Sequence, residues 1–194
     1  MTTPQEILAF WFEEISPMEQ FMGGPEIDDR ISQRFGGAWE QAASGECNDW
    51  AESADGALAL VILLDQFPRN MFRGSGKSFA TDQMAREVAD RAIRDGHDMQ
   101  MAEPRRLFLY MPFMHSEELA EQDRCVDLIA ERMTETGAQN LLHARAHRGI
   151  IEMFGRFPYR NEALGRENTA EEAEWMANVG YRKFVQDLEE AGQD

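Results

Sequence analysis

The sequence predicts an all-α protein, a single compact domain of about eight antiparallel-packed helices over residues 1–194. Three observations support this prediction. Apolar residues recur in most segments at the three- and four-residue spacing of one helix face. No segment keeps the apolar–polar alternation of a half-buried strand. The turns between segments are mostly short, and consecutive helices joined by short turns pack as antiparallel neighbours.

The first helix is predicted to begin after Thr3, where Thr-Pro provides an N-cap and a proline at the first helical position. Ser16 and Pro17 are expected to end it. A loop through residues 23–25 then leads to a second helix, which ends near Gly45. The second helix carries an apolar residue at every fourth position: Ile27, Ile31, Phe35 and Trp39.

The nearly all-apolar stretch from Ala57 to Leu64 fits a buried strand or a buried helix. We predict a helix, because Ala and Leu dominate the stretch and the chain offers no other strand to pair with it. Pro68 is expected to break this helix, and a turn follows at residues 74–76. An amphipathic helix is predicted over residues 81–94, ending at Gly96.

The C-terminal half begins with a short helix that starts at Pro104 and is cut off by Pro112. Ser116 is predicted to be the N-cap of a long helix that reaches about Glu135. The next helix is expected over residues 139–154.

Two further helices are predicted near the C-terminus. Thr169 and Glu172 have the spacing of a capping box, which places a helix start there. The last segment, residues 180–194, is expected to be a helix that frays at its end.

The composition limits the class of partner. The formal net charge is −17, from 36 acidic and 19 basic residues. This excess repels nucleic-acid phosphates and anionic lipids, so we expect neither a nucleic acid nor a membrane as partner. The longest apolar run is also too short to span a bilayer.

The two cysteines, Cys47 and Cys125, lie far apart without the CxxC spacing of a zinc ribbon. They are typical of a reducing compartment, and the first residues lack the basic stretch of a signal peptide. We therefore expect a cytoplasmic protein. No Gly-rich phosphate loop, dinucleotide fingerprint or nucleophile elbow is present, so no cofactor is predicted.

Two polar inserts, residues 64–74 and 154–166, are attached to apolar helices. Each has Phe-Pro at a helix end, then Arg-Asn, with a further arginine next to a glycine. One interpretation is that they bind an anionic small molecule, because the guanidinium fork matches carboxylate and phosphate. The candidate ligand-binding residues are Asp65, Gln66, Arg69, Asn70, Arg73, Arg156, Arg160, Asn161 and Arg166.

A structural interpretation of the same inserts stays open. Asp65 is placed to pair with Arg69 or Arg73, and asparagines satisfy backbone groups of turns. The arginines, aspartate and histidines would then form a buried network that sets how the helices pack.

Histidines add a second kind of candidate. His115 precedes Ser116 and Glu117, where the expected helix start favours a cap and a glutamate. The alternative is that His115 acts as a general base or a metal ligand. His143 and His147 share one helix face, but the intervening glutamate of a zincin motif is absent, and no metal is predicted.

Four segments occur together in a fixed order along the chain. They are Phe-Trp-Phe at residues 10–12, Leu-Leu-Asp-Gln-Phe-Pro-Arg-Asn at 63–70, His-Ser-Glu at 115–117, and the stretch 147–166. In these segments the chain resembles the bacterial domain-of-unknown-function family 924, over nearly its whole length. That resemblance implies a fold similar to tetratricopeptide-like helical hairpins. Tyr159 departs from the family, which usually has histidine there, so no role of that histidine is carried over.

The resemblance implies one shared residue set and no established activity. Were the protein an enzyme, His115 or His147 would be its acid or base. Asp65 or Glu117 would orient that histidine, and the arginines would stabilise charge. The shared set is Asp65, Gln66, Arg69, Asn70, Arg73, His115, Glu117, His147, Arg156, Arg160, Asn161 and Arg166.

Two functions are compatible with this set. The leading one is binding of an anionic small molecule in a pocket lined by arginines and histidines. The alternative is a tetratricopeptide-like protein–protein interaction scaffold, in which the shared set is a structural network. An acidic scaffold would prefer a basic protein partner.

Overall fold

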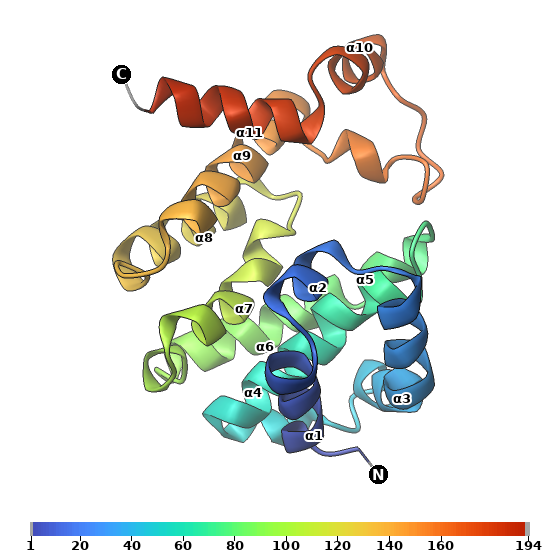
Figure 1. Cartoon of the computed structure of the whole chain (residues 1–194), viewed down its shortest axis with the longest axis vertical. Helices are drawn as coiled ribbons and strands as arrows, with labels where there is room; N and C mark the ends of the chain where they lie inside the picture. The colour runs from blue at the N-terminus through green and yellow to red at the C-terminus, as the bar shows by residue number, and fades with distance from the viewer. Residues whose placement is uncertain (1, 193–194) are drawn as a thin grey trace. The chain divides into compact units, whose positions relative to one another are not determined.

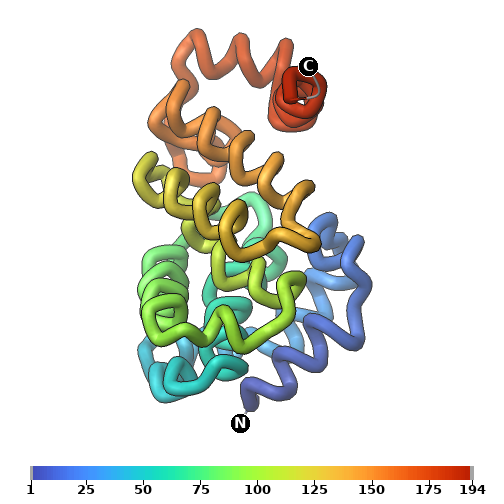
Figure 2. Tube along the Cα trace, turned by 90° about the vertical axis from the view of Figure 1, so that its left-hand side faces the viewer, coloured from blue at the N-terminus to red at the C-terminus, as the bar shows by residue number. Residues whose placement is uncertain are grey.

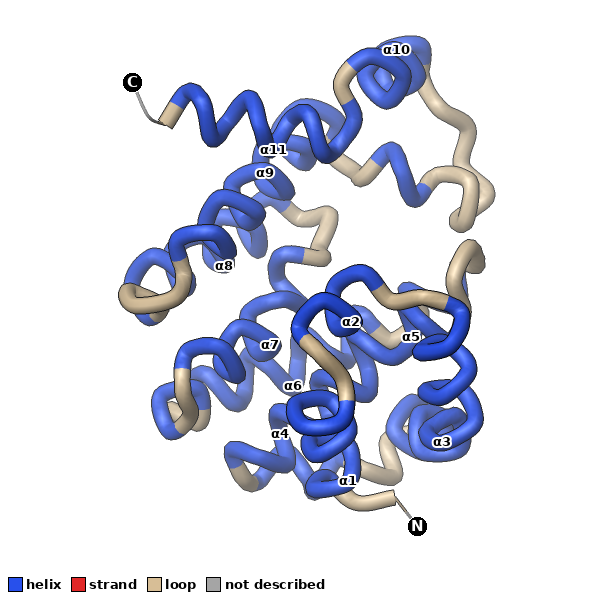
Figure 3. The backbone as a smooth tube through the Cα atoms, viewed as in Figure 1, coloured by secondary structure: helices blue, strands red, loops and turns tan. Residues whose placement is uncertain are grey.

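The computed structural model describes residues 2–192, which form helices and turns and no strand (Figure 3). The all-α prediction is therefore confirmed. The chain divides into a first unit, Met1–Ala102, and a second unit, Glu103–Asp194. The expectation of a single domain over residues 1–194 stays a prediction. The described residues contain eleven α-helices, close to the expected eight, since several of the eleven are a single turn or two.

The first unit contains six of these α-helices (Figure 1). Two π-helical turns and three short 3-10 helices link them. The bounds are α1 Pro4–Ala9, η1 Phe10–Glu14, α2 Pro17–Met22, α3 Pro25–Ala43, η2 Asn48–Glu52, α4 Ala54–Val61, η3 Ile62–Gln66, α5 Phe67–Met71, η4 Gly76–Phe79, α6 Asp82–Arg94 and η5 Asp98–Gln100.

The helix α4 is buried in the core of the first unit. Every residue from Ala57 to Leu64 is at most 1% exposed, and α4 packs against α1, α6 and η2. The predicted helix is confirmed, and the alternative of a buried strand is not. The rings of Phe10, Phe35 and Phe67 pack with centroids 5.0 to 6.0 Å apart, and burial of this apolar surface stabilises the unit.

The prediction that Pro68 breaks this helix is wrong. The chain continues through η3 into α5, so residues 54–71 form one helical run. The Phe67 N–H donates to the Ile62 carbonyl, five residues back, in a turn wider than an α-helical turn. Pro68 has no N–H to donate to the Leu64 carbonyl, and that carbonyl instead accepts from the Thr81 hydroxyl at 2.5 Å.

The loop predicted between Ser16 and Pro25 is also wrong in part, because α2 forms there. The Ser16 side chain accepts from the Glu19 N–H at 3.3 Å, and the Glu19 carboxylate accepts from the Ser16 N–H at 2.7 Å. This capping box is visible in the sequence as Ser-x-x-Glu and predicts a helix start. Gly23, with φ of 61°, ends α2.

The second unit contains the remaining five α-helices. The helix α8 packs against both α7 and α9, and α11 packs against α9; Figure 2 shows the chain folding back at each short link. The bounds are α7 Glu103–Met114, α8 Leu119–Arg132, α9 Ala138–Phe154, η6 Pro158–Arg160, α10 Ala170–Asn178 and α11 Gly180–Ala191.

Two predicted boundaries in the second unit are wrong. Pro112 lies inside α7, which continues to Met114, because buried side chains on either side of it, Tyr110 and Phe113, favour the continued helix. Ser116 is not the N-cap of α8, which begins after Glu118. The Ser116 side chain instead accepts from the Glu118 N–H at 3.2 Å, in the link between the helices.

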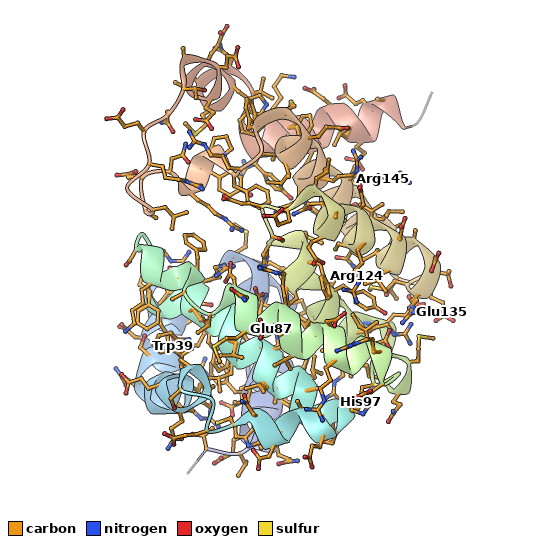
Figure 4. The ribbon with its side chains drawn as sticks, turned by 180° about the vertical axis from the view of Figure 1, so that it is seen from behind. Trp39, Glu87, His97, Arg124, Glu135 and Arg145 are labelled. Carbon is orange, nitrogen blue, oxygen red and sulfur yellow. The ribbon has the colours of Figure 1, made fainter. Side chains whose placement is uncertain are left out.

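The C-terminal predictions hold better. The Thr169–Glu172 capping box is confirmed at the start of α10, and α11 is the expected last helix. The fraying expected within residues 180–194 stays a prediction, since α11 covers Gly180–Ala191 and residues 193–194 lie outside the described residues. The interior of the second unit is partly aromatic, and the guanidinium of Arg124, labelled in Figure 4, lies 4.4 Å from the centroid of the Phe113 ring.

Within residues 2–192, none of the helices combines the length and the apolar character that crossing a bilayer requires.

Replacing glycine by alanine should have opposite effects on stability at two helical positions, Gly37 and Gly56. A Cβ at Gly56 in α4 would overlap the Trp50 carbonyl oxygen, whereas a Cβ at Gly37 in α3 meets nothing within 4 Å. We expect Gly37→Ala to raise the free energy of unfolding by about 0.5–1 kcal/mol. Gly56→Ala should lower it by about 1–3 kcal/mol. Urea denaturation measures both, and stabilisation by Gly56→Ala would contradict the tight turn before α4.

Candidate functional site

The predicted site residues are divided between the two units. Asp65, Gln66, Arg69, Asn70 and Arg73 belong to the first unit. The remaining ones belong to the second unit: His115, Glu117, His147, Arg156, Arg160, Asn161 and Arg166.

Arg69 in α5 forms a bidentate ion pair with Asp82, the first residue of α6. Nη1 to Oδ1 and Nη2 to Oδ2 both measure 2.8 Å. Arg69 also donates to the Ser78 carbonyl, and its Nη2 lies 3.6 Å from the carboxylate of Asp65. Asp65 is fully buried and accepts from the Gln66 side chain. The sequence-based pairing of Asp65 with Arg69 is therefore present.

Arg73, the other partner considered for that aspartate, pairs with Asp28 in α3. Arg73 Nε and Nη2 lie 2.8 and 2.9 Å from the two carboxylate oxygens, and Asn70 Nδ2 donates at 2.8 Å. Burial acts to raise the pKa of Asp28, but the hydrogen bonds from Arg73 and Asn70 hold it below its usual value. These contacts join α5 to the start of α3.

Arg156, just after α9, binds the buried carboxylate of Glu172 in α10. Its Nε and Nη2 donate to the two carboxylate oxygens at 2.6 and 2.8 Å, and Nη2 also donates to the Glu167 carbonyl at 3.0 Å. Asn161 Nδ2 donates to Glu172 at 3.2 Å. Glu172 is 2% exposed, and the hydrogen bond from Arg156 is the main reason that its pKa falls to about 2.

Arg166 forms a third bidentate pair, with Glu117. Its Nη1 and Nη2 donate to the two carboxylate oxygens at 2.7 and 2.9 Å, and Glu117 also accepts from the Phe157 N–H at 2.9 Å. Burial acts to raise the pKa of Glu117, yet the bond from Arg166 keeps it below its usual value. Glu117 therefore fixes the second insert to the α7–α8 link.

Arg160 and two histidines form a cluster in the same unit. Arg160 is 8% exposed, donates through Nη1 to the His115 carbonyl at 3.0 Å and lies 4.4 Å over the Phe157 ring. The rings of His115 and His147 are 6.5 Å apart. His115 closes the last turn of α7, its N–H donating to Met111 at 2.9 Å. The sequence-based expectation that His115 directly precedes a helix start is therefore wrong.

His147 is kept neutral by its surroundings. Its Nδ1 lies 2.8 Å from the His143 carbonyl oxygen, which only accepts, so Nδ1 carries the proton and Nε2 the lone pair. Burial lowers the pKa of His147 to about 3, and the positive charge of Arg160 acts in the same direction. The Tyr181 hydroxyl lies 2.8 Å from His143 Nδ1 and 3.3 Å from His147 Nδ1.

Comparison with known proteins bears out the resemblance. A family model described as "Bacterial protein of unknown function (DUF924)" matches residues 7–180. The chain belongs to this family. A solved structure of a protein of unknown function from Agrobacterium tumefaciens is 43% identical, with a TM-score of 0.83. The likeness covers 89% of this DUF924 chain and 96% of that one. No protein with a curated description matches.

The sequence did not reveal three of the carboxylates that the arginines of this DUF924 member bind. Asp28, Asp82 and Glu172 each lie in the first turn of a helix. That position is a sequence signal, because the positive end of the helix favours a carboxylate. Which arginine pairs with which carboxylate depends on how the helices pack. Among residues 2–192, no group of three His, Cys, Asp or Glu side chains is placed to hold a metal ion.

The ion pair of Arg156 predicts an acid-dependent stability. The pKa of Glu172 is about 2 in the folded chain and near 4.5 in the unfolded chain, so its stabilising contribution is present above about pH 5. It is lost as the pH falls towards 2. We expect Arg156→Met to lower the free energy of unfolding at neutral pH and to flatten this acid loss.

The measurement is urea denaturation at several pH values. Arg148→Met is the matched control, because Arg148 pairs with two carboxylates that are 50% and 59% exposed. Such exposed pairs contribute little. Equal effects of the two substitutions would contradict a special role of the Glu172 pair.

The low pKa of His147 predicts a second pH dependence of the stability of the folded chain. Its pKa of about 3 lies below the unfolded value near 6.5, so the unfolded state binds the proton first and stability falls as the pH drops below 6.5. NMR of the imidazole nitrogens should show His147 as the Nδ1–H tautomer, without titration between about pH 8 and pH 4. A His147 midpoint near 6.5 would contradict the lowered pKa.

Proposed function

We propose that this protein is a helical protein-interaction domain in which the arginines of the two inserts fix the helices. One observation supports this above all others: Arg69, Arg156 and Arg166 each place two guanidinium nitrogens on a carboxylate. A bidentate pair occupies the fork that an anionic ligand would need. Such a ligand would have to displace a carboxylate that is already well placed.

Each pair joins two different elements of its unit. Arg69 ties α5 to α6, and Arg73, two residues after α5, pairs with Asp28 in α3. Arg156 ties the end of α9 to α10, and Arg166 ties the second insert to Glu117 in the α7–α8 link. Partly buried, bidentate pairs of this kind fix the orientation of the helices that they join. Removing one of the arginines should therefore destabilise helix packing rather than weaken the binding of a ligand.

A protein partner is favoured by the outer surface. The chain carries a net charge of −17. Several large apolar side chains are nevertheless exposed, four of them methionines: Met18 by 73%, Met22 by 68%, Met99 by 56% and Met153 by 47%. Flexible, polarisable methionine side chains are common at surfaces that bind protein segments.

A second function, binding of an anionic small molecule, is favoured by the cluster in the second unit. Arg160 lies close enough to His147 for its charge to lower that pKa, and His115 is next to both. An anion that carries a hydrogen, such as hydrogen phosphate, would pair with the guanidinium and donate to Nε2 of His147. His147 would then act as a neutral acceptor, since a pKa of about 3 makes it a poor general base.

Thermal unfolding with inorganic phosphate or citrate separates the two functions. If the arginines are structural, neither anion should raise the melting temperature by more than about 1 °C, and Arg69→Ala should cost on the order of 3 kcal/mol. A saturable rise that Arg160→Met abolishes, but Arg148→Met retains, would instead establish the anion site.

The protein partner itself is tested by chemical cross-linking and capture of the full chain from the bacterium that encodes it. A partner at about one copy per chain supports the interaction domain, and anion-dependent stabilisation without any partner overturns it.

A further inference from the structure

The short helix α2 presents an apolar face outwards. Met18, Phe21 and Met22 are 73%, 56% and 68% exposed. Their spacing of three and four residues places them on one side of the helix. We call these three side chains the α2 face. Exposed large apolar side chains normally occur singly on a surface, so three together on a single helix face indicate a contact surface.

The α2 face is held rigidly at both ends. The capping box of Ser16 and Glu19 fixes the start of α2, and Gln20 donates to the Trp11 carbonyl at 2.5 Å. At the other end Gly23 has φ of 61°, and a Cβ there would lie 2.5 Å from Arg73 Nη2. A surface that is already ordered loses little entropy on binding.

The same contacts give two predicted site residues a positioning role. Arg73 and Asn70 bind Asp28 in the first turn of α3, and both side chains come close to Gly23. They therefore set where α2 ends and α3 begins. Arg73 and Asn70 of the first insert thus position the α2 face.

The segments that precede and follow α2 in the sequence are acidic. Residues 1–29 contain seven acidic side chains and no lysine, arginine or histidine. Glu13, Glu26 and Asp29 among them are exposed. An apolar face between acidic, exposed segments matches a helix that is apolar on one side and basic on its flanks.

We propose that the α2 face binds a basic amphipathic helix of a partner protein. This assignment rests on the proposed interaction function and names its surface and its partner class. The methionines adapt to the apolar side of the incoming helix, and the glutamates pair with its lysines and arginines. Binding should weaken with added salt, because the paired charges are solvent-exposed and screened.

The test uses the full chain and two synthetic, fluorescently labelled peptides of about 18 residues, or five helical turns. Both have leucine on one helix face; one has lysine and arginine on its flanks, the other glutamate. Fluorescence anisotropy should show saturable binding of the basic peptide and at least about tenfold weaker binding of the acidic one. No saturable binding of the basic peptide overturns the proposal.

The variant Met18→Glu/Met22→Glu identifies the surface. It adds two negative charges, so purely electrostatic attraction would make the basic peptide bind more tightly, whereas loss of apolar contact weakens binding by about tenfold or more. Met99→Glu/Met153→Glu adds the same charge at exposed methionines outside α2 and should bind at least as well as the unmodified chain. Unchanged or tighter binding of the α2 variant overturns the proposal.

Two further outcomes are decisive. Sedimentation equilibrium that shows a dimer, lost in the α2 variant, would assign the face to a second copy of the chain and overturn the proposal. A cross-linked protein partner that the α2 variant retains would also overturn it, while leaving the proposed interaction function intact. Loss of that partner in the α2 variant alone, with the basic peptide bound by the unmodified chain, supports both.

Discussion

The bidentate pairing of arginine with carboxylates is the interaction on which the arrangement of each unit depends. Two of these carboxylates, Asp82 and Glu172, lie in the first turn of a helix, where backbone N–H groups already favour negative charge. Both are also mostly buried. An exposed pair such as Lys183 with Asp187 contributes about 0–1 kcal/mol, because water screens it. A buried carboxylate without its arginine would be far more costly. The pairs therefore act as fixed points between helices.

The pairing of arginines within each unit also affects the charge of the surface. The chain has 19 basic residues against 36 acidic ones, and its two inserts direct several arginines towards carboxylates of the same unit. Much of the remaining acidic charge faces solvent. On such a surface, ordered apolar side chains are best matched by a basic, amphipathic segment. Arg73 links the two properties, because it binds Asp28 and at the same time borders the end of α2.

Local signals predicted the structure well, and signals that depend on neighbours did not. The caps at Thr3 and Thr169 were correct because a side chain and the backbone three residues on satisfy each other. Pro68 and Pro112 were read as helix ends, yet a π-helical turn and buried aromatic neighbours keep the chain helical. The candidate site shows the same division: the inserts, Asp65 and Glu117 were visible in the sequence, but the partners Asp28 and Asp82 were not.

The sequence by itself determined that the chain is helical, where most helices lie, and which two inserts hold its unusual arginines. Periodicity, capping residues and family motifs suffice for this, because each acts over a few neighbouring positions. Only the tertiary structure decided that Arg69 meets Asp82 and Arg156 meets Glu172, and that His147 is neutral. Those facts depend on which residues packing brings together and on how much water it removes, and neither quantity is local in sequence.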